Sequence, residues 1–135
     1  MLPGDELIPT IAQCCPLIES IPTERWSLTD VGLNILANIP TLRELKLTSD
    51  VCTSAAAQRL IEAHPNLTLI SLEGKDLDDA LVNCIGRHCG NLRSLKLYKS
   101  RSSFLSDDTL QELFRGCPLL ESFNLEQPRR ISNLT

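Results

Sequence analysis

The sequence predicts an α/β solenoid in which a parallel β-sheet is backed by a row of helices. A leucine-containing stretch recurs along the chain, a turn signal precedes each copy, and a helix start follows most of them. The first apolar residues of the five copies are 24, 25, 25 and 28 positions apart: Ile18, Leu42, Leu67, Leu92 and Leu120. Because the period is nearly constant, we expect one structural unit stacked five times.

Each unit is expected to open with a turn and a short strand. Proline or glycine ends one element there before an extended segment begins. The residues after the turn alternate between apolar and polar, as in Leu95, Lys96 and Leu97, which suits a strand with one buried face. Pro22 falls in the strand expected for the first unit, where a missing N–H donor is tolerated at a sheet edge. The turns are Cys15-Pro16, Ile39-Pro40, His64-Pro65, Cys89-Gly90-Asn91 and Cys117-Pro118.

A helix is expected after each strand. Apolar residues recur there at helical spacing, for example Leu81 with Ile85. Good N-cap residues stand ahead of these segments, namely Thr29, Thr53, Asp78 and Ser106. Acidic residues favoured in a first helical turn follow them: Asp30, Asp79, Asp107 and Asp108. One unit cannot bury its own apolar face, so stacked units are expected to share a core between the sheet and the helices.

Composition restricts the class of ligand. The chain has 135 residues, of which 42% are apolar and 22% charged, as in one globular domain. A net charge of -4 and 4% aromatic residues give little to bind a phosphate backbone or stack bases, so we expect no nucleic acid partner. No run approaches the roughly 18 apolar residues of a membrane span, and the first residues lack a secretion signal. We therefore expect a cytoplasmic or nuclear protein with no membrane partner.

The cysteines are expected to be structural. Six cysteines in a chain without a secretion signal suggest reduced, buried side chains. Cys15, Cys89 and Cys117 share one position of the repeat with Ile39 and His64. These are single residues on successive units, whereas zinc sites use paired ligands a few residues apart. We call this position the slot and predict that it is buried.

The remaining titratable residues form no catalytic pattern. Cys84 is expected on a helix face, although it lies near His88. His64 and His88 are expected at helix ends or turns, with no nucleophile motif beside either. We therefore predict that the chain is not an enzyme and has no cofactor and no metal site.

The repeat resembles that of leucine-rich-repeat proteins of the cysteine-containing subtype, which reads roughly C-P-x-L-x-x-L-x-L and then L-T-D-x-x-L. Residues 117–125, CPLLESFNL, match with one leucine-to-phenylalanine change, and residues 28–33, LTDVGL, match the helix half. The resemblance covers nearly the whole chain. It implies a right-handed leucine-rich-repeat solenoid over residues 1–135, with about five repeats, the parallel sheet on the concave face and the helices on the convex face.

The same subtype is found in the substrate-binding halves of F-box proteins, which link targets to SCF-type ubiquitin ligases, and in ribonuclease-inhibitor-like scaffolds. The resemblance implies a protein–protein interaction module, first of all the substrate-recognition segment of an F-box-type ligase subunit. The alternative is a free-standing scaffold or inhibitor unrelated to ubiquitin. No F-box stretch precedes the first repeat, so we expect a segment of a longer chain that would reach the ligase components through that missing part.

The outward strand positions are the predicted binding surface. Repeat solenoids bind partners on such faces, and Tyr98 belongs to a residue type enriched at interface hot spots. Lys99 and Arg101 belong to KSRSS, which carries a three-residue insertion and suits either an acidic or phosphorylated partner or a merely solvated loop. An ordinary solvated sheet face is the alternative. The candidate protein-binding residues are Glu44, Lys46, Ser71, Glu73, Ser94, Lys96, Tyr98, Lys99, Arg101, Asn124 and Glu126.

Overall fold

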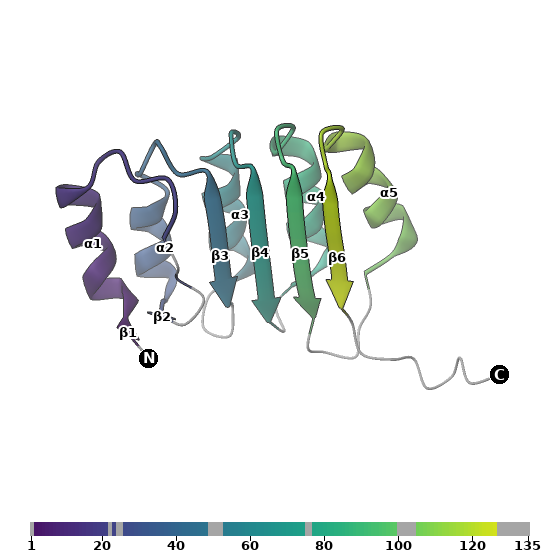
Figure 1. The fold of residues 1–135 in the computed structure, drawn as a ribbon. Helices are drawn as coiled ribbons and strands as arrows, with labels where there is room; N and C mark the ends of the chain where they lie inside the picture. Colours follow the sequence, from purple (N-terminus) through teal and green to yellow (C-terminus); the bar gives the residue numbers. More distant parts are fainter. Residues whose placement is uncertain are drawn as a thin grey trace.

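Strands and helices alternate along the chain in the computed structural model (Figure 1), which describes residues 2–21, 23, 26–48, 53–74, 77–99 and 105–126. Four parallel strands form one sheet in the order β3-β4-β5-β6. Neighbours in the sheet are consecutive in the sequence, as expected for units of one kind that follow one another along the chain. The strands are β3 (Glu44–Thr48), β4 (Leu69–Gly74), β5 (Ser94–Lys99) and β6 (Ser122–Glu126).

Five helices occur among the described residues, and each contacts the next one along the chain. Figure 1 shows the helices on one side of the four-stranded sheet, while its other face carries no helix in the described part of the chain. A second sheet of two short parallel strands joins β1 (Leu2–Pro3) to β2 (Trp26–Ser27). The helices are α1 (Gly4–Cys14), α2 (Asp30–Leu36), α3 (Ser54–Glu62), α4 (Asp79–His88) and α5 (Asp107–Gly116).

The core lies between the sheet and the helices. The register places Leu47, Leu72, Leu97 and Leu125 side by side on neighbouring strands, and the first three are buried. Leu92, Leu95 and Leu97 are all 0% exposed, so the first apolar residue of this unit and both inward residues of its strand lie in the core, as expected for a strand with one buried face. Apolar helix residues complete this core, among them Leu60, Ile61, Leu81, Val82 and Ile85.

The four predicted N-caps are confirmed. Each side chain accepts the N–H of a residue in the first turn of its helix, which satisfies a donor that has no partner inside the helix. The bonds run from Val31 to Thr29 (3.2 Å), from Ala56 to Thr53 (3.1 Å), from Leu81 to Asp78 (2.8 Å) and from Thr109 to Ser106 (3.2 Å).

Main-chain bonds join the units at the start of each strand. The Thr68 carbonyl accepts N–H groups from Arg93 (2.9 Å) and Ser94 (3.0 Å) in the next unit. The Arg43 carbonyl and the Arg93 carbonyl each accept an equivalent pair of N–H groups from the unit that follows. The same bond pair links the Glu19 carbonyl to Arg43 and Glu44. The first unit is therefore joined to the second by the same pattern of main-chain hydrogen bonds that joins the later units.

The strand predicted for the first unit is not formed as expected. Residues 18–21 adopt no strand, and Pro22 lies outside the described residues. Thr23 instead donates a side-chain hydrogen bond to the Lys46 carbonyl of β3. A side-chain donor thus takes the place of a main-chain ladder bond, next to a proline that has no N–H to give. The prediction of one regular strand in every unit was wrong here.

Helix α1 was missed by the sequence analysis. It carries Pro9 in its interior, and its N-cap residue, Pro3, provides no side-chain cap. Both features normally argue against a helix. The acidic residue Asp5 in its first turn accepts N–H bonds from Thr29 and Gly32 (3.0 Å each), so this helix is tied to the next unit.

Burial of the slot is confirmed for four units and wrong for the first. Ile39, His64, Cys89 and Cys117 are buried, whereas Cys15 is exposed. The Cys117 thiol donates to the Cys89 carbonyl (3.4 Å), and Nε2 of His64 lies 2.7 Å from the Ile39 carbonyl oxygen. Two of the slot side chains thus pack on the slot carbonyl of the preceding unit. Cys15 has no such unit before it in the described residues.

Candidate functional site

Nine of the predicted binding residues, all but Lys99 and Arg101, occupy strand positions that alternate with the inward-facing residues, so they lie on the sheet face opposite the helices. Glu73, Lys96, Asn124 and Glu126 are exposed. The half-buried members are Glu44, Lys46, Ser71, Ser94 and Tyr98. The main chain of Lys99 ends β5, while Arg101 and most of the KSRSS insertion lie outside the described residues.

The strand register arranges this face in rows that run across the sheet. One row holds Lys46, Ser71, Lys96 and Asn124. The next holds Thr48, Glu73, Tyr98 and Glu126. A third row, towards the strand starts, holds Glu44, Leu69, Ser94 and Ser122. With strands about 4.8 Å apart, a row across four strands is about 14 Å long.

The rows differ in charge. Lys46 and Lys96 make the first row basic, whereas Glu73 and Glu126 stand on either side of Tyr98 in the second. Two rows of opposite charge, about 7 Å apart along the strands, suit a partner that presents both charges in a matching order. Half-buried Tyr98 offers an aromatic surface and a hydroxyl at the same place, which is typical of interface anchors.

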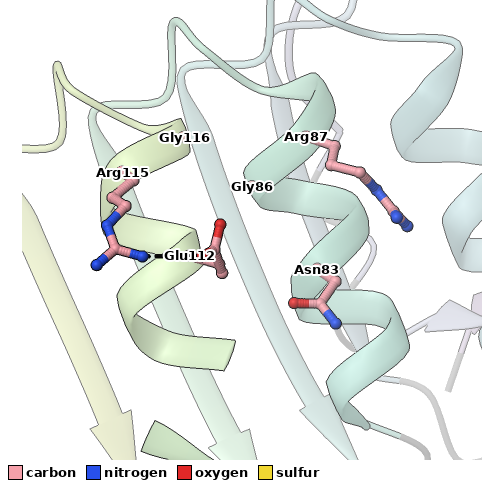
Figure 2. Close-up of a pocket in the computed structure, with 6 residues that line it drawn as sticks. All are labelled: Asn83, Gly86, Arg87, Glu112, Arg115 and Gly116. Atoms are coloured by element: carbon pink, nitrogen blue, oxygen red, sulfur yellow. Dashed lines mark hydrogen bonds and ion pairs between the residues drawn. The ribbon is translucent and has the colours of Figure 1, made fainter. Parts of the chain in front are cut away.

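A groove of about 460 Å³ lies on the other side of the molecule, between α4 and α5 (Figure 2). Its floor is a close contact between two glycines: a Cβ on Gly116 would lie 1.9 Å from the Gly86 carbonyl oxygen. Arg115 pairs with Glu112 (2.8 Å), and Figure 2 shows Arg87 pointing away from Arg115. Since the two guanidinium groups do not converge, the groove is best explained by helix packing.

A second cluster lies between α3 and α4. Carboxylate, thiol and imidazole ligand atoms of Glu62, Cys84 and His88 all lie within 4.8 Å of one another. Glu62 is the last residue of α3, and His88 is the last residue of α4. Cys84 is buried, whereas Glu62 and His88 are exposed. Cys84 lies on a helix face, as predicted, whereas no pattern in the sequence indicates that Glu62 joins the cluster.

The pKa of the Cys84 thiol is raised to about 11, chiefly by burial and then by the nearby Glu62 carboxylate, while the charge of Arg87 acts to lower it. The thiol donates to the Gln58 carbonyl at 3.5 Å. In the absence of another charge the group is therefore a neutral thiol near pH 7. The spacing of four between Cys84 and His88 was the one sequence signal for the cluster, because such residues share a helix face.

The described residues contain no helix with both the length and the apolar character required to cross a bilayer. A comparison of the sequence with models of known protein families found no match.

Proposed function

We propose that the chain is a leucine-rich-repeat solenoid segment that binds another protein through the sheet face opposite its helices. The repeat motif, the consecutive order of the parallel strands and the recurring bonds between units support this proposal. Proteins built in this way commonly use the extended sheet face for binding.

The observation that carries the proposal is the pairing of a basic row with an acidic row around Tyr98. Tyr98 lies between Glu73 and Glu126, and Lys96 precedes it on the same strand. A partner segment that crosses the strands would place acidic groups over the lysines and basic groups over the glutamates. Such complementarity gives specificity and fast association, while the tyrosine supplies contact area at little cost in side-chain entropy.

The biological role that we propose is substrate recognition for an F-box-type SCF ubiquitin ligase, in the cytoplasm or nucleus. Its support is the resemblance of residues 117–125 and 28–33 to the cysteine-containing repeat. An F-box elsewhere in the gene product would supply the contact with the ligase. The alternative role is a scaffold or inhibitor that uses the same face without any link to ubiquitin.

The test is affinity purification of the complete gene product from its own cells, followed by quantitative mass spectrometry. The test variant carries Lys96→Glu and Tyr98→Ala. The control carries Arg115→Glu and Gln111→Ala, the same two kinds of change on exposed residues of α5. Circular dichroism of each purified variant checks that the fold is kept.

We expect one partner to be lost from the sheet variant and retained by the helix control. Loss of a hot-spot tyrosine reduces affinity by at least about 30-fold. Cullin and its adaptor in every sample would support the ligase role. If both are absent and a partner is still lost from the sheet variant alone, the scaffold role is favoured. A partner retained equally by both variants would overturn the assignment of the binding face.

A further inference from the structure

We propose that Glu62, Cys84 and His88 form a site for a divalent transition-metal cation of the zinc class, bridging α3 and α4. The site is separate from the sheet face and does not depend on the function proposed above. It would join two consecutive units of the fold on their helix side.

The backbone already brings the three ligands together. Cys84 and His88 are one helical turn apart on α4, so their side chains share a face. Glu62 approaches from the end of α3, which packs against α4. The ligand atoms lie within 4.8 Å of one another. A tetrahedral zinc ion with bonds of 2.0–2.3 Å separates its ligand atoms by about 3.3–3.6 Å, so a closure of about 1 Å completes the geometry.

The burial of the three residues suits this closure. Glu62 and His88 are exposed, and their side chains can rotate towards the ion from the solvent side. Cys84 is buried, so its thiol is a fixed anchor behind them. Three protein ligands on an accessible site leave the fourth tetrahedral position to a water molecule.

The ligand set selects the class of metal. Thiolate, imidazole and carboxylate are the groups that bind zinc, whereas magnesium and calcium prefer oxygen ligands alone. The thiol of Cys84 releases its proton to the solvent when the metal–sulfur bond forms, and the cation then carries the local positive charge. The imidazole of His88 and the carboxylate of Glu62 replace water molecules of the hydrated cation, and the S–H bond is the only covalent bond of the three side chains that breaks.

The electrostatics of the helix ends also favour a cation. Glu62 and His88 each end a helix, and the helix dipole places a partial negative charge at that end. The carboxylate of Glu62 adds a full negative charge. Arg87 is the opposing group, since its positive charge acts on Cys84 from the same helix. Removal of that charge is therefore expected to tighten metal binding.

The first experiment is a titration of the reduced, metal-free protein with Co²⁺ alone, followed by Zn²⁺. Co²⁺ bound to a thiolate in a tetrahedral site gives a sulfur-to-metal charge-transfer band and visible absorption, and Zn²⁺ should abolish both at one equivalent. The variants are Cys84→Ser, His88→Gln, Glu62→Gln and Arg87→Gln. The control is the Cys14→Ser, Cys15→Ser variant, which removes two exposed thiols outside the cluster.

We expect the charge-transfer band to disappear in Cys84→Ser and to persist in the control. His88→Gln and Glu62→Gln should weaken Co²⁺ binding at least about tenfold, since even indirect contacts to a metal ligand are worth that much. Arg87→Gln should strengthen it. His88 and Glu62 are exposed, so these two variants test the site even if Cys84→Ser unfolds. A band that survives His88→Gln and Glu62→Gln unchanged, a band lost in the control, or no band at all would overturn the proposal.

Discussion

The first unit and the interior units share one sequence pattern but differ in what they bury. Cys89 and Cys117 occupy the slot in later units and are buried, whereas Cys15 occupies it in the first unit and is exposed. Cys117 packs on the slot carbonyl of the unit before it. Cys15 has no counterpart before it in the described residues. The comparison shows that the pattern defines a unit, whereas burial is provided by its neighbours.

The last described unit, at the other end, is likewise less buried than an interior unit. In β4 the inward residues Ile70 and Leu72 are almost fully buried, whereas in β6 Phe123 and Leu125 are only half-buried. Phe123 packs edge-to-face on Phe114 at a centroid distance of 5.0 Å. That contact covers part of the end of the core, where no further unit is described.

The largest expected contrast is in thiol reactivity between the first unit and the interior. Burial, and then the neighbouring thiols of Cys117 and Cys84, raise the pKa of Cys89 to about 12 from 9.0. The thiolate is the reactive form, so Cys89 should be alkylated about a thousandfold more slowly than an unperturbed thiol. Cys14 and Cys15 are exposed and should react first.

Brief treatment with iodoacetamide at pH 8, followed by peptide mass spectrometry, measures this difference. Protein unfolded in guanidinium chloride is the control, because there all the cysteines should react alike. Equal labelling of Cys89 and Cys15 in the native protein would contradict the packing of the slot.

The next contrast is in stability, between two leucines at one register position. Leu97 is 0% exposed in β5, and its partner Leu125 in β6 is half-buried. We expect Leu97→Ala to lower the free energy of unfolding by about 3 kcal/mol, and Leu125→Ala by about 1 kcal/mol, since the end of the stack leaves a smaller cavity. Urea denaturation followed by circular dichroism measures both. Equal losses would mean that the end of the stack is as well covered as its interior.

The smallest contrast concerns the hydrogen bonds by which Asp5 of α1 holds the start of α2 in the first unit. Burial of the Asp5 carboxyl raises its pKa, but hydrogen bonds from the Thr29 hydroxyl and from the N–H groups of Thr29 and Gly32 outweigh this and lower the pKa below its ordinary value. Asp5→Asn should therefore cost about 1 kcal/mol at pH 7, the size of one exposed cap.

The pH dependence of this cost has a definite sign. Because folding lowers the pKa of Asp5, its stabilisation is complete above the unfolded value of about 3.9 and is lost as the pH falls through the folded value. Denaturation midpoints of the wild type and Asp5→Asn should converge below that pH. Glu6→Gln, on the exposed next residue, is the control and should change stability by less than about 0.5 kcal/mol. A difference in midpoint between the wild type and Asp5→Asn that stays constant at all pH values would show that the stabilisation does not depend on the charged carboxylate of Asp5.

The repeating elements could be predicted from local patterns of residues. Thr29, Thr53, Asp78 and Ser106 marked the helix starts, and the leucine spacing marked each turn and strand from Leu42 onward. These signals depend on hydrogen bonds and side-chain directions within a few residues, so they can be read locally. The order and register of the strands followed from the repeat, and so did the set of residues on the helix-free face.

Features that need a neighbouring unit could not be predicted in this way, because they arise from packing between units. Helix α1 forms in spite of Pro9, because it packs on α2 and its Asp5 binds the start of that helix. Cys15 is exposed, and the described residues include no earlier slot that could pack against it. Glu62 meets Cys84 and His88 because α3 lies beside α4. Contacts of this kind join residues far apart in the chain, and local propensity carries no information about them.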